Sequence, residues 1–134
     1  MMVLEKKRLC ILTLSVSLLV MGSSVFAGTS WSSEESKSLP GWNGSAYSST
    51  QTKADIGQAG LQMNATEGYE IDVRTEGTSG NSNGVNGSWV RDVKGGNTYN
   101  LSAPQSKGDN LRLHFSSNLT TTKSTNIVYK WRSN

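Results

Sequence analysis

Residues 69–76 alternate strictly between apolar or β-branched side chains and charged ones. Tyr, Ile, Val and Thr occupy the odd positions, and Glu, Asp, Arg and Glu occupy the even ones. Successive side chains of a β-strand point to opposite faces of the sheet. The odd set is therefore expected to face a core and the even set to face water, which predicts a half-buried β-strand.

Shorter segments with a related pattern recur between turns rich in Gly and Asn. They cover residues 45–53, 58–64, 88–94, 98–103, 110–115 and 126–132. Thr, Val, Tyr and Trp are common in them, and good helix formers do not accumulate in any periodic window. We therefore predict an all-β fold, a small antiparallel β-sandwich of about six to seven strands.

The same alternation predicts which side chains form the core. The expected buried residues are Ile71, Val73, Leu111, Leu113, Ile127, Tyr129 and Trp131. Four further aromatic side chains are expected to point inward: Tyr69, Trp89, Tyr99 and Phe115. A small core that lacks disulfides needs large apolar groups of this kind.

Residues 1–27 have the three-part layout of a cleaved signal peptide. Three basic residues at 6–8 precede an apolar run at 9–21, and Val25 and Ala27 occupy the positions that a signal peptidase reads. The alternative, a retained membrane anchor, is disfavoured because a membrane span needs about 20 apolar residues. We expect a secreted, extracellular protein.

The only cysteine, Cys10, lies inside this segment. The exported chain would therefore contain no disulfide, and Cys10 is too early in the apolar run to carry a lipid anchor. Export without disulfides, after a Lys-rich start, is typical of a Gram-positive bacterial protein.

After cleavage, residues 28–44 are expected to form a polar, poorly ordered leader with an edge strand near Trp42. Residues 45–134 are expected to form a single β-sandwich domain. Three of the thirteen Lys and Arg residues and one of the ten acidic residues lie in the signal peptide, so the exported chain has ten basic and nine acidic side chains, a net charge of +1. This balance argues against nucleic acid as a partner.

The chain has little of the machinery that catalysis or metal binding requires. His114 is its only histidine, and no G-x-S-x-G nucleophile motif occurs. A zinc site needs three or four His, Cys or carboxylate ligands, and no calcium-loop spacing is found. Glu70, Asp72 and Glu76 are expected on a solvated strand face. We expect no enzyme activity and no cofactor. No metal is expected either, and calcium held by oxygen ligands such as Asp72, Asp92 and Asp109 is the alternative.

Two features could contact a partner. Trp31 and Trp42 lie in the polar leader, outside any alternation, and could supply apolar anchors. The loop at residues 77–87, with Asn81, Asn83 and Asn86, is expected to be mobile and adaptable. We predict that these five residues bind a cell-envelope glycan or protein.

The second half of the chain resembles a domain-of-unknown-function family of small exported Gram-positive proteins. The segments that carry the resemblance are VNG at 85–87, DVKGGNTY at 92–99, DNLRL at 109–113 and VYKW at 128–131. The resemblance implies a signal peptide, a β-rich domain and a terminal aromatic pair, and some members look bacteriocin-like. Val128 departs from the Gly that members often have there. No catalytic residue is implied.

Three functions remain open at this point. The favoured one is a small secreted, non-enzymatic binding or interaction protein, of which a bacteriocin-like toxin is one form. The second is a small hydrolase of cell wall or glycan that uses Glu70 or Asp72 with His114. The third is a structural component of the cell envelope or matrix.

Overall fold

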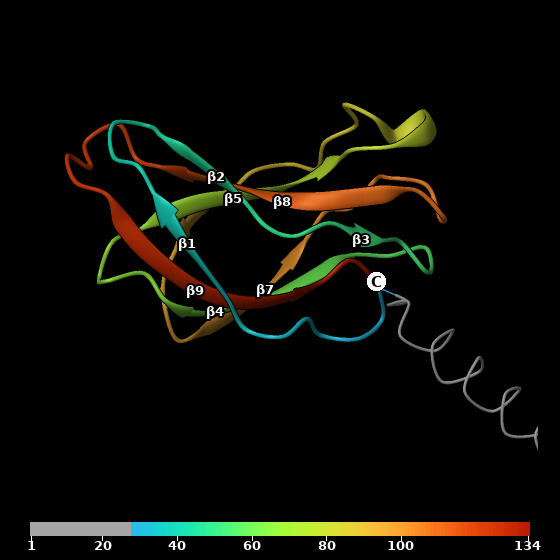
Figure 1. Cartoon of the computed structure of the whole chain (residues 1–134), viewed down its shortest axis with the longest axis horizontal. Helices are drawn as coiled ribbons and strands as arrows, with labels where there is room; N and C mark the ends of the chain where they lie inside the picture. Colours follow the sequence, from blue (N-terminus) through green and yellow to red (C-terminus); the bar gives the residue numbers. More distant parts are fainter. Residues whose placement is uncertain (1–27) are drawn as a thin grey trace, which may run out of the picture.

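The computed structural model describes residues 28–134; the predicted signal peptide lies outside the described residues. The chain forms nine strands and one 3-10 turn, without an α-helix in the described part (Figure 1). The strands are β1 Glu35–Leu39, β2 Ser45–Tyr47, β3 Gln51–Thr52, β4 Ala59–Ala65, β5 Ile71–Gly77, β6 Val90–Val93, β7 Asn97–Leu101, β8 Asn110–Ser117 and β9 Thr125–Arg132, with the 3-10 turn η1 at Gly80–Ser82.

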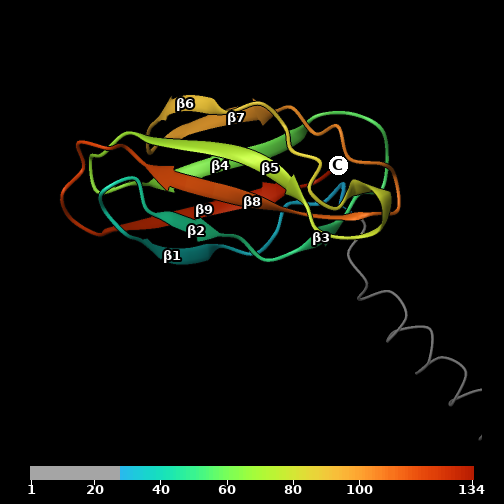
Figure 2. The same cartoon turned by 90° about the horizontal axis from the view of Figure 1, so that it is seen from above.

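The strands make two antiparallel sheets packed face to face. One sheet has four strands in the order β1-β9-β4-β7; the other has five, in the order β2-β8-β5-β6, with β3 also paired to β8. Figure 2 shows the strands of one sheet lying over those of the other. The predicted all-β sandwich is confirmed, with nine strands where six to seven were expected.

The core lies between the sheets and is formed by inward side chains of both. All seven residues predicted to be buried are at most 1% exposed, and Phe115 is fully buried against Tyr129, with ring centroids 4.6 Å apart. Leu39, Leu61, Met63, Val93 and Leu101 complete the large apolar side chains of this cluster. The alternation in β5, β8 and β9 therefore identified the core correctly.

The expected inward positions of Trp89 and Tyr69 were wrong. A β-bulge places Arg91 and Asp92 opposite the single residue Asp72, because Ile71 pairs with Val93 while Val73 pairs with Val90. The extra residue turns both valines toward the core, and Trp89 then lies on the outer face. Tyr69 precedes β5 in a turn and is exposed.

The segment expected to be a poorly ordered leader contains an ordered edge strand. β1 pairs with β9 from Glu35 opposite Tyr129 to Leu39 opposite Thr125, and Leu39 is fully buried. The Tyr129 hydroxyl donates a hydrogen bond to Glu35 Oε1 at 3.1 Å. Residues 35–39 are therefore part of the sandwich, which does not begin at residue 45.

Candidate ligand-binding face

The outer face of the five-stranded sheet carries three rows of polar and aromatic side chains. Strand register sets the rows, since β5, β8 and β2 are neighbours and every second side chain points outward. The first row is Asp72, Ser116 and Ser45; the second is Arg74, His114 and Tyr47; the third is Glu76 and Arg112. Trp89 and Arg91 close the face at the β6 side.

Asp72 was expected to be solvated, but it is only 5% exposed. Arg91 Nη1 donates to its Oδ2 at 2.7 Å, and the backbone N–H of Asp92 donates to its Oδ1 at 3.3 Å. The bulge in β6 brings both donors to this carboxylate. Burial is tolerated because the charge is paired and hydrogen-bonded.

Glu76 is held in the third row by Arg112, whose Nη2 donates at 2.7 Å. Its other oxygen lies 3.3 Å from His114 Nδ1, outside hydrogen-bonding geometry. His114 Nε2 instead shares a hydrogen bond with Ser45 Oγ at 2.9 Å. Burial lowers the pKa of His114, and Arg74 and Arg112 lower it further against the opposing effect of Glu76.

Aromatic and cationic groups stack across the face and fix one another. The His114 ring lies 4.8 Å from Tyr47 and 5.1 Å from Trp89, measured between centroids. The Arg112 guanidinium covers Tyr47 at 3.9 Å, and that of Arg74 covers Trp89 at 4.6 Å. These contacts hold the rings in place, so the face is organised before any ligand arrives.

A hollow of about 320 Å³ opens beside this stack. Its walls are Asn43, Ser45, Asp72, Trp89, Arg91, His114 and Ser116. The lining combines one large aromatic ring with hydroxyl, amide, carboxylate and guanidinium groups. An aromatic wall beside donors and acceptors for hydroxyl groups suits a polyhydroxylated ligand such as a sugar.

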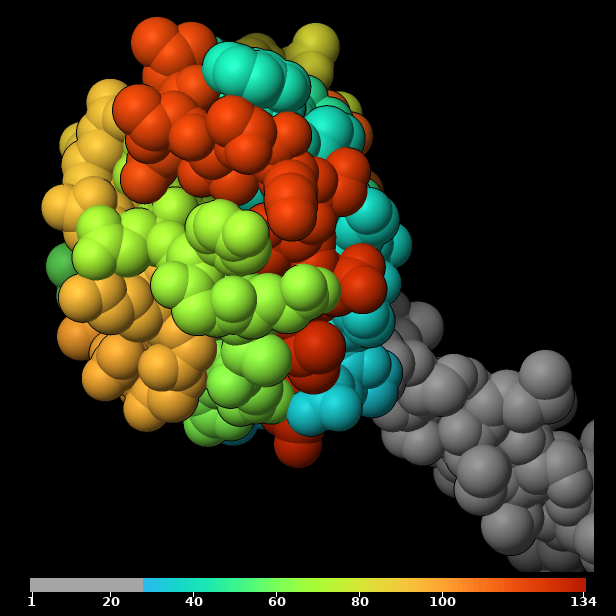
Figure 3. Space-filling view, turned by 90° about the vertical axis from the view of Figure 1, so that its left-hand side faces the viewer, coloured from blue at the N-terminus to red at the C-terminus, as the bar shows by residue number. Residues whose placement is uncertain are grey.

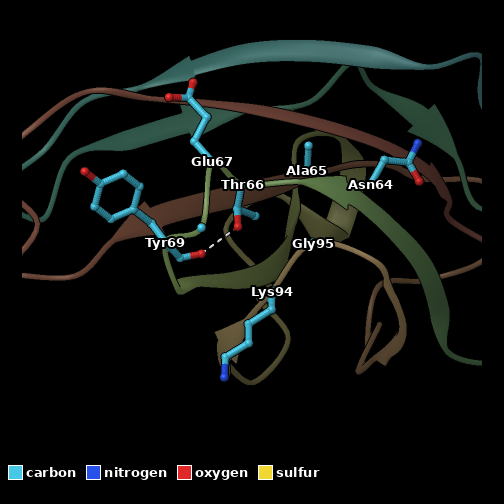
Figure 4. Close-up of a pocket in the computed structure, with 8 residues that line it drawn as sticks. Asn64, Ala65, Thr66, Glu67, Tyr69, Lys94 and Gly95 are labelled. Atoms are coloured by element: carbon cyan, nitrogen blue, oxygen red, sulfur yellow. Dashed lines mark hydrogen bonds between the residues drawn. The ribbon is translucent and has the colours of Figure 1, made fainter.

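A larger hollow of about 520 Å³ lies at one end of the sandwich, between the turns at residues 64–69 and 94–95. These turns lie side by side on the end face in Figure 3. The close-up in Figure 4 shows Glu67, Tyr69 and Lys94 pointing in different directions. Lys94 pairs with Glu70 at 3.0 Å, and this contact raises its pKa. No set of polar groups converges there, so it is the weaker candidate.

The predicted binding residues do not form one surface. Trp42 is 67% exposed in the β1–β2 turn, at the opposite end of the molecule from η1 (Figure 1). Asn81, Asn83 and Asn86 are exposed around η1. Trp31 is half-buried and lies 4.8 Å from the Arg132 guanidinium, on the outer face of the four-stranded sheet.

The loop at residues 77–87 is held by its own hydrogen bonds. Gly77 N–H donates to Val85 O and Gly84 N–H donates to Gly77 O. The buried Ser82 hydroxyl donates to Asp109 at 2.7 Å. An adaptable, loosely tethered loop was expected, and this bonding instead fixes its path.

Sequence reasoning placed Asp72 and His114 on outward faces but missed the hollow that they share. Trp89 was assigned to the core, and Tyr47 was not singled out. Glu70, the other proposed catalytic carboxylate, does not line the hollow. One signal was available in the sequence. Asp72 and Glu76 are acidic, whereas Arg112 and His114 on another predicted strand are basic, as expected of side chains on neighbouring strands.

Within residues 28–134 no three His, Cys, Asp or Glu side chains gather closely enough to hold a metal ion. Over the same range no helix is long and apolar enough to cross a membrane. Comparisons with protein families, with curated proteins and with solved structures found no match. The family resemblance, which covers roughly residues 69–132, stays a prediction.

Proposed function

We propose that this chain is an exported, non-enzymatic binding protein that recognises a cell-envelope glycan on the outer face of the five-stranded sheet. The single observation that carries the proposal is the polar hollow walled by Trp89. The Trp89 ring, which the Arg74 and Arg91 guanidinium groups approach at 4.6 and 5.9 Å, forms a fixed apolar wall, and the groups around it offer hydrogen bonds in a preorganised arrangement.

The test is binding of the purified protein to isolated cell walls and to a glycan array. Trp89→Ala should weaken binding at least about tenfold, since central aromatic side chains dominate many interfaces. Trp42→Ala is the matched control, because Trp42 is exposed and lies outside the hollow. Loss of binding in Trp42→Ala but not in Trp89→Ala would contradict the proposal and place the binding site at the β1–β2 turn.

A second candidate is hydrolysis, since Asp72 and His114 both line the hollow. The carboxylate of Asp72 is occupied by Arg91 and by a backbone N–H, so binding is the better proposal. Incubation with wall polymers followed by sizing of the products separates the two. Shortened polymer that depends on Asp72 in a folded Asp72→Asn variant would favour the enzyme.

If the protein is a bacteriocin-like toxin, its binding to the envelope of competing cells should also inhibit their growth. Growth inhibition of related Gram-positive bacteria, abolished by the same Trp89→Ala change, would support it. Retention of the protein in the producer's own envelope, without inhibition, would favour the structural alternative.

A further inference from the structure

Three arginines lie on the outer face of the five-stranded sheet, and two of them are paired with carboxylates. Arg91 pairs with Asp72 and Arg112 pairs with Glu76, each at 2.7 Å. Arg74 lies between these pairs on β5, and among the described residues no carboxylate oxygen comes within 4.0 Å of it. Among the described residues, Arg74 is therefore the arginine of this face that lacks a carboxylate partner.

The surroundings of Arg74 fix the guanidinium without satisfying it. It stacks on Trp89 at 4.6 Å, and its Nε is buried without a hydrogen-bond partner in the described part of the chain. Buried donors are normally paired, and an arginine left without an anion can pair with one that comes from outside. Stacking removes much of the side chain's freedom in advance, which lowers the entropic cost of binding.

Arg74 also lies within reach of the hollow. The hollow covers the first row of the face, at Asp72, and Arg74 stands two residues further along β5. Two residues of a strand span about 7 Å. A sugar ring against Trp89 would therefore place a neighbouring substituent or the next unit of a polymer beside Arg74.

We propose that the ligand of this face is an acidic glycan whose carboxylate or phosphate group pairs with Arg74 while a neutral part of it fills the hollow. This inference rests on the proposed function and specifies its ligand. Because Asp72 and Glu76 are already neutralised by their arginines, they do not repel such a ligand strongly.

The experiment compares a polyuronate, a polyol-phosphate wall polymer and neutral dextran as probes at two salt concentrations. We expect the protein to bind an acidic probe more tightly than dextran, with binding that weakens as salt rises. Arg74→Gln should reduce acidic-probe binding about tenfold or more, as expected for a lost charge-assisted hydrogen bond. Arg74→Lys should lose less, since it keeps the charge.

Arg132→Gln is the matched control, because Arg132 also stacks on a tryptophan and also has an unpaired buried Nε, but lies outside the outer face of the five-stranded sheet. It should bind as the parent does. The polyuronate carries carboxylate groups and the polyol-phosphate polymer carries phosphate groups, so comparing the two shows which anion pairs with Arg74.

The outcomes separate the two proposals. Equal binding of acidic and neutral probes, lost in Trp89→Ala but unchanged in a folded Arg74→Gln, would overturn the acidic ligand and leave the glycan site. Absence of binding to every wall polymer would overturn both. If Arg74→Gln fails to fold, the salt dependence of the parent protein decides, and salt-independent binding would overturn the inference.

Discussion

Trp42 occupies a backbone conformation that residues other than glycine rarely adopt. Its φ is 57° and that of Asn43 is 58°, in a turn closed by Gly44 N–H donating to Gly41 O at 3.2 Å. Asn tolerates this region, but a left-handed conformation costs a bulky residue about 1–2 kcal/mol. The ring is 67% exposed, so little burial is lost when it is removed.

Trp42→Gly should therefore raise the melting temperature slightly, by a few degrees at most. Trp42→Ala is the control, because it removes the ring and keeps the strained φ, and it should give no such rise. A clear drop in melting temperature for both variants would show that the Trp42 side chain packs against the molecule.

His114 makes the stability of the fold depend on pH below about 6.5, the ordinary pKa of a histidine. Its pKa is lowered in the folded state, so the unfolded chain takes up a proton first as the pH falls. Stability is then fully present above pH 6.5 and decreases as the pH falls below it. Glu76, Arg74 and Arg112 are the charged groups acting on His114.

Because His114 is the only histidine, His114→Gln should remove most of this pH dependence. The measurement is the urea midpoint at a series of pH values from 7.5 to 5, compared between the parent and the variant. The assignment fails if the variant loses stability over this range as steeply as the parent does.

At the scale of elements, β8 is the strand on which the five-stranded sheet depends. It pairs with β2, β3 and β5, and Leu111, Leu113 and Phe115 on its inner face are fully buried.

Leu113→Ala should lower the free energy of unfolding by about 2–5 kcal/mol. Leu119→Ala, the same change at a side chain that is 72% exposed in the turn after β8, should have almost no effect. Urea denaturation of both variants measures the difference, and equal midpoints would contradict the burial assigned to β8.

Strands with regular alternation could be predicted from the sequence, and strands that depend on distant pairing could not. β5, β8 and β9 each carry their own inward and outward pattern. β1 contains one buried apolar residue, Leu39, and is ordered by pairing with β9 at the far end of the chain. The bulge in β6 follows from its register against β5, and that register decides where Trp89 points. The hollow depends on these registers, so its residues could be assigned to a face but not to one site.

At the scale of the whole molecule, the first described residues and the last ones close the structure together. Asn134 N–H donates to Gly28 O at 2.6 Å, Ser32 N–H donates to Trp131 O at 2.7 Å, and β1 covers the edge of β9. Residues 28–39 therefore stabilise the C-terminal strand, and their removal would leave buried groups of β9 without partners. Residues 28–134 contain no cysteine, and a small domain without disulfides relies on such edge pairing for its stability.

This closure predicts where a protease cuts the native protein. A protease needs a locally unfolded segment, so cleavage follows the segments that open most easily. Lys37 lies within β1, paired opposite Ile127, whereas Lys123 lies in the turn between β8 and β9. Brief trypsin digestion, followed by mass spectrometry, should give cleavage after Lys123 well before cleavage after Lys37. Addition of urea near the unfolding midpoint should remove this difference, since both sites are then exposed. A leader that is unordered in solution would instead be cut first at Lys37 in native buffer, and the edge strand β1 would then be absent from the native protein.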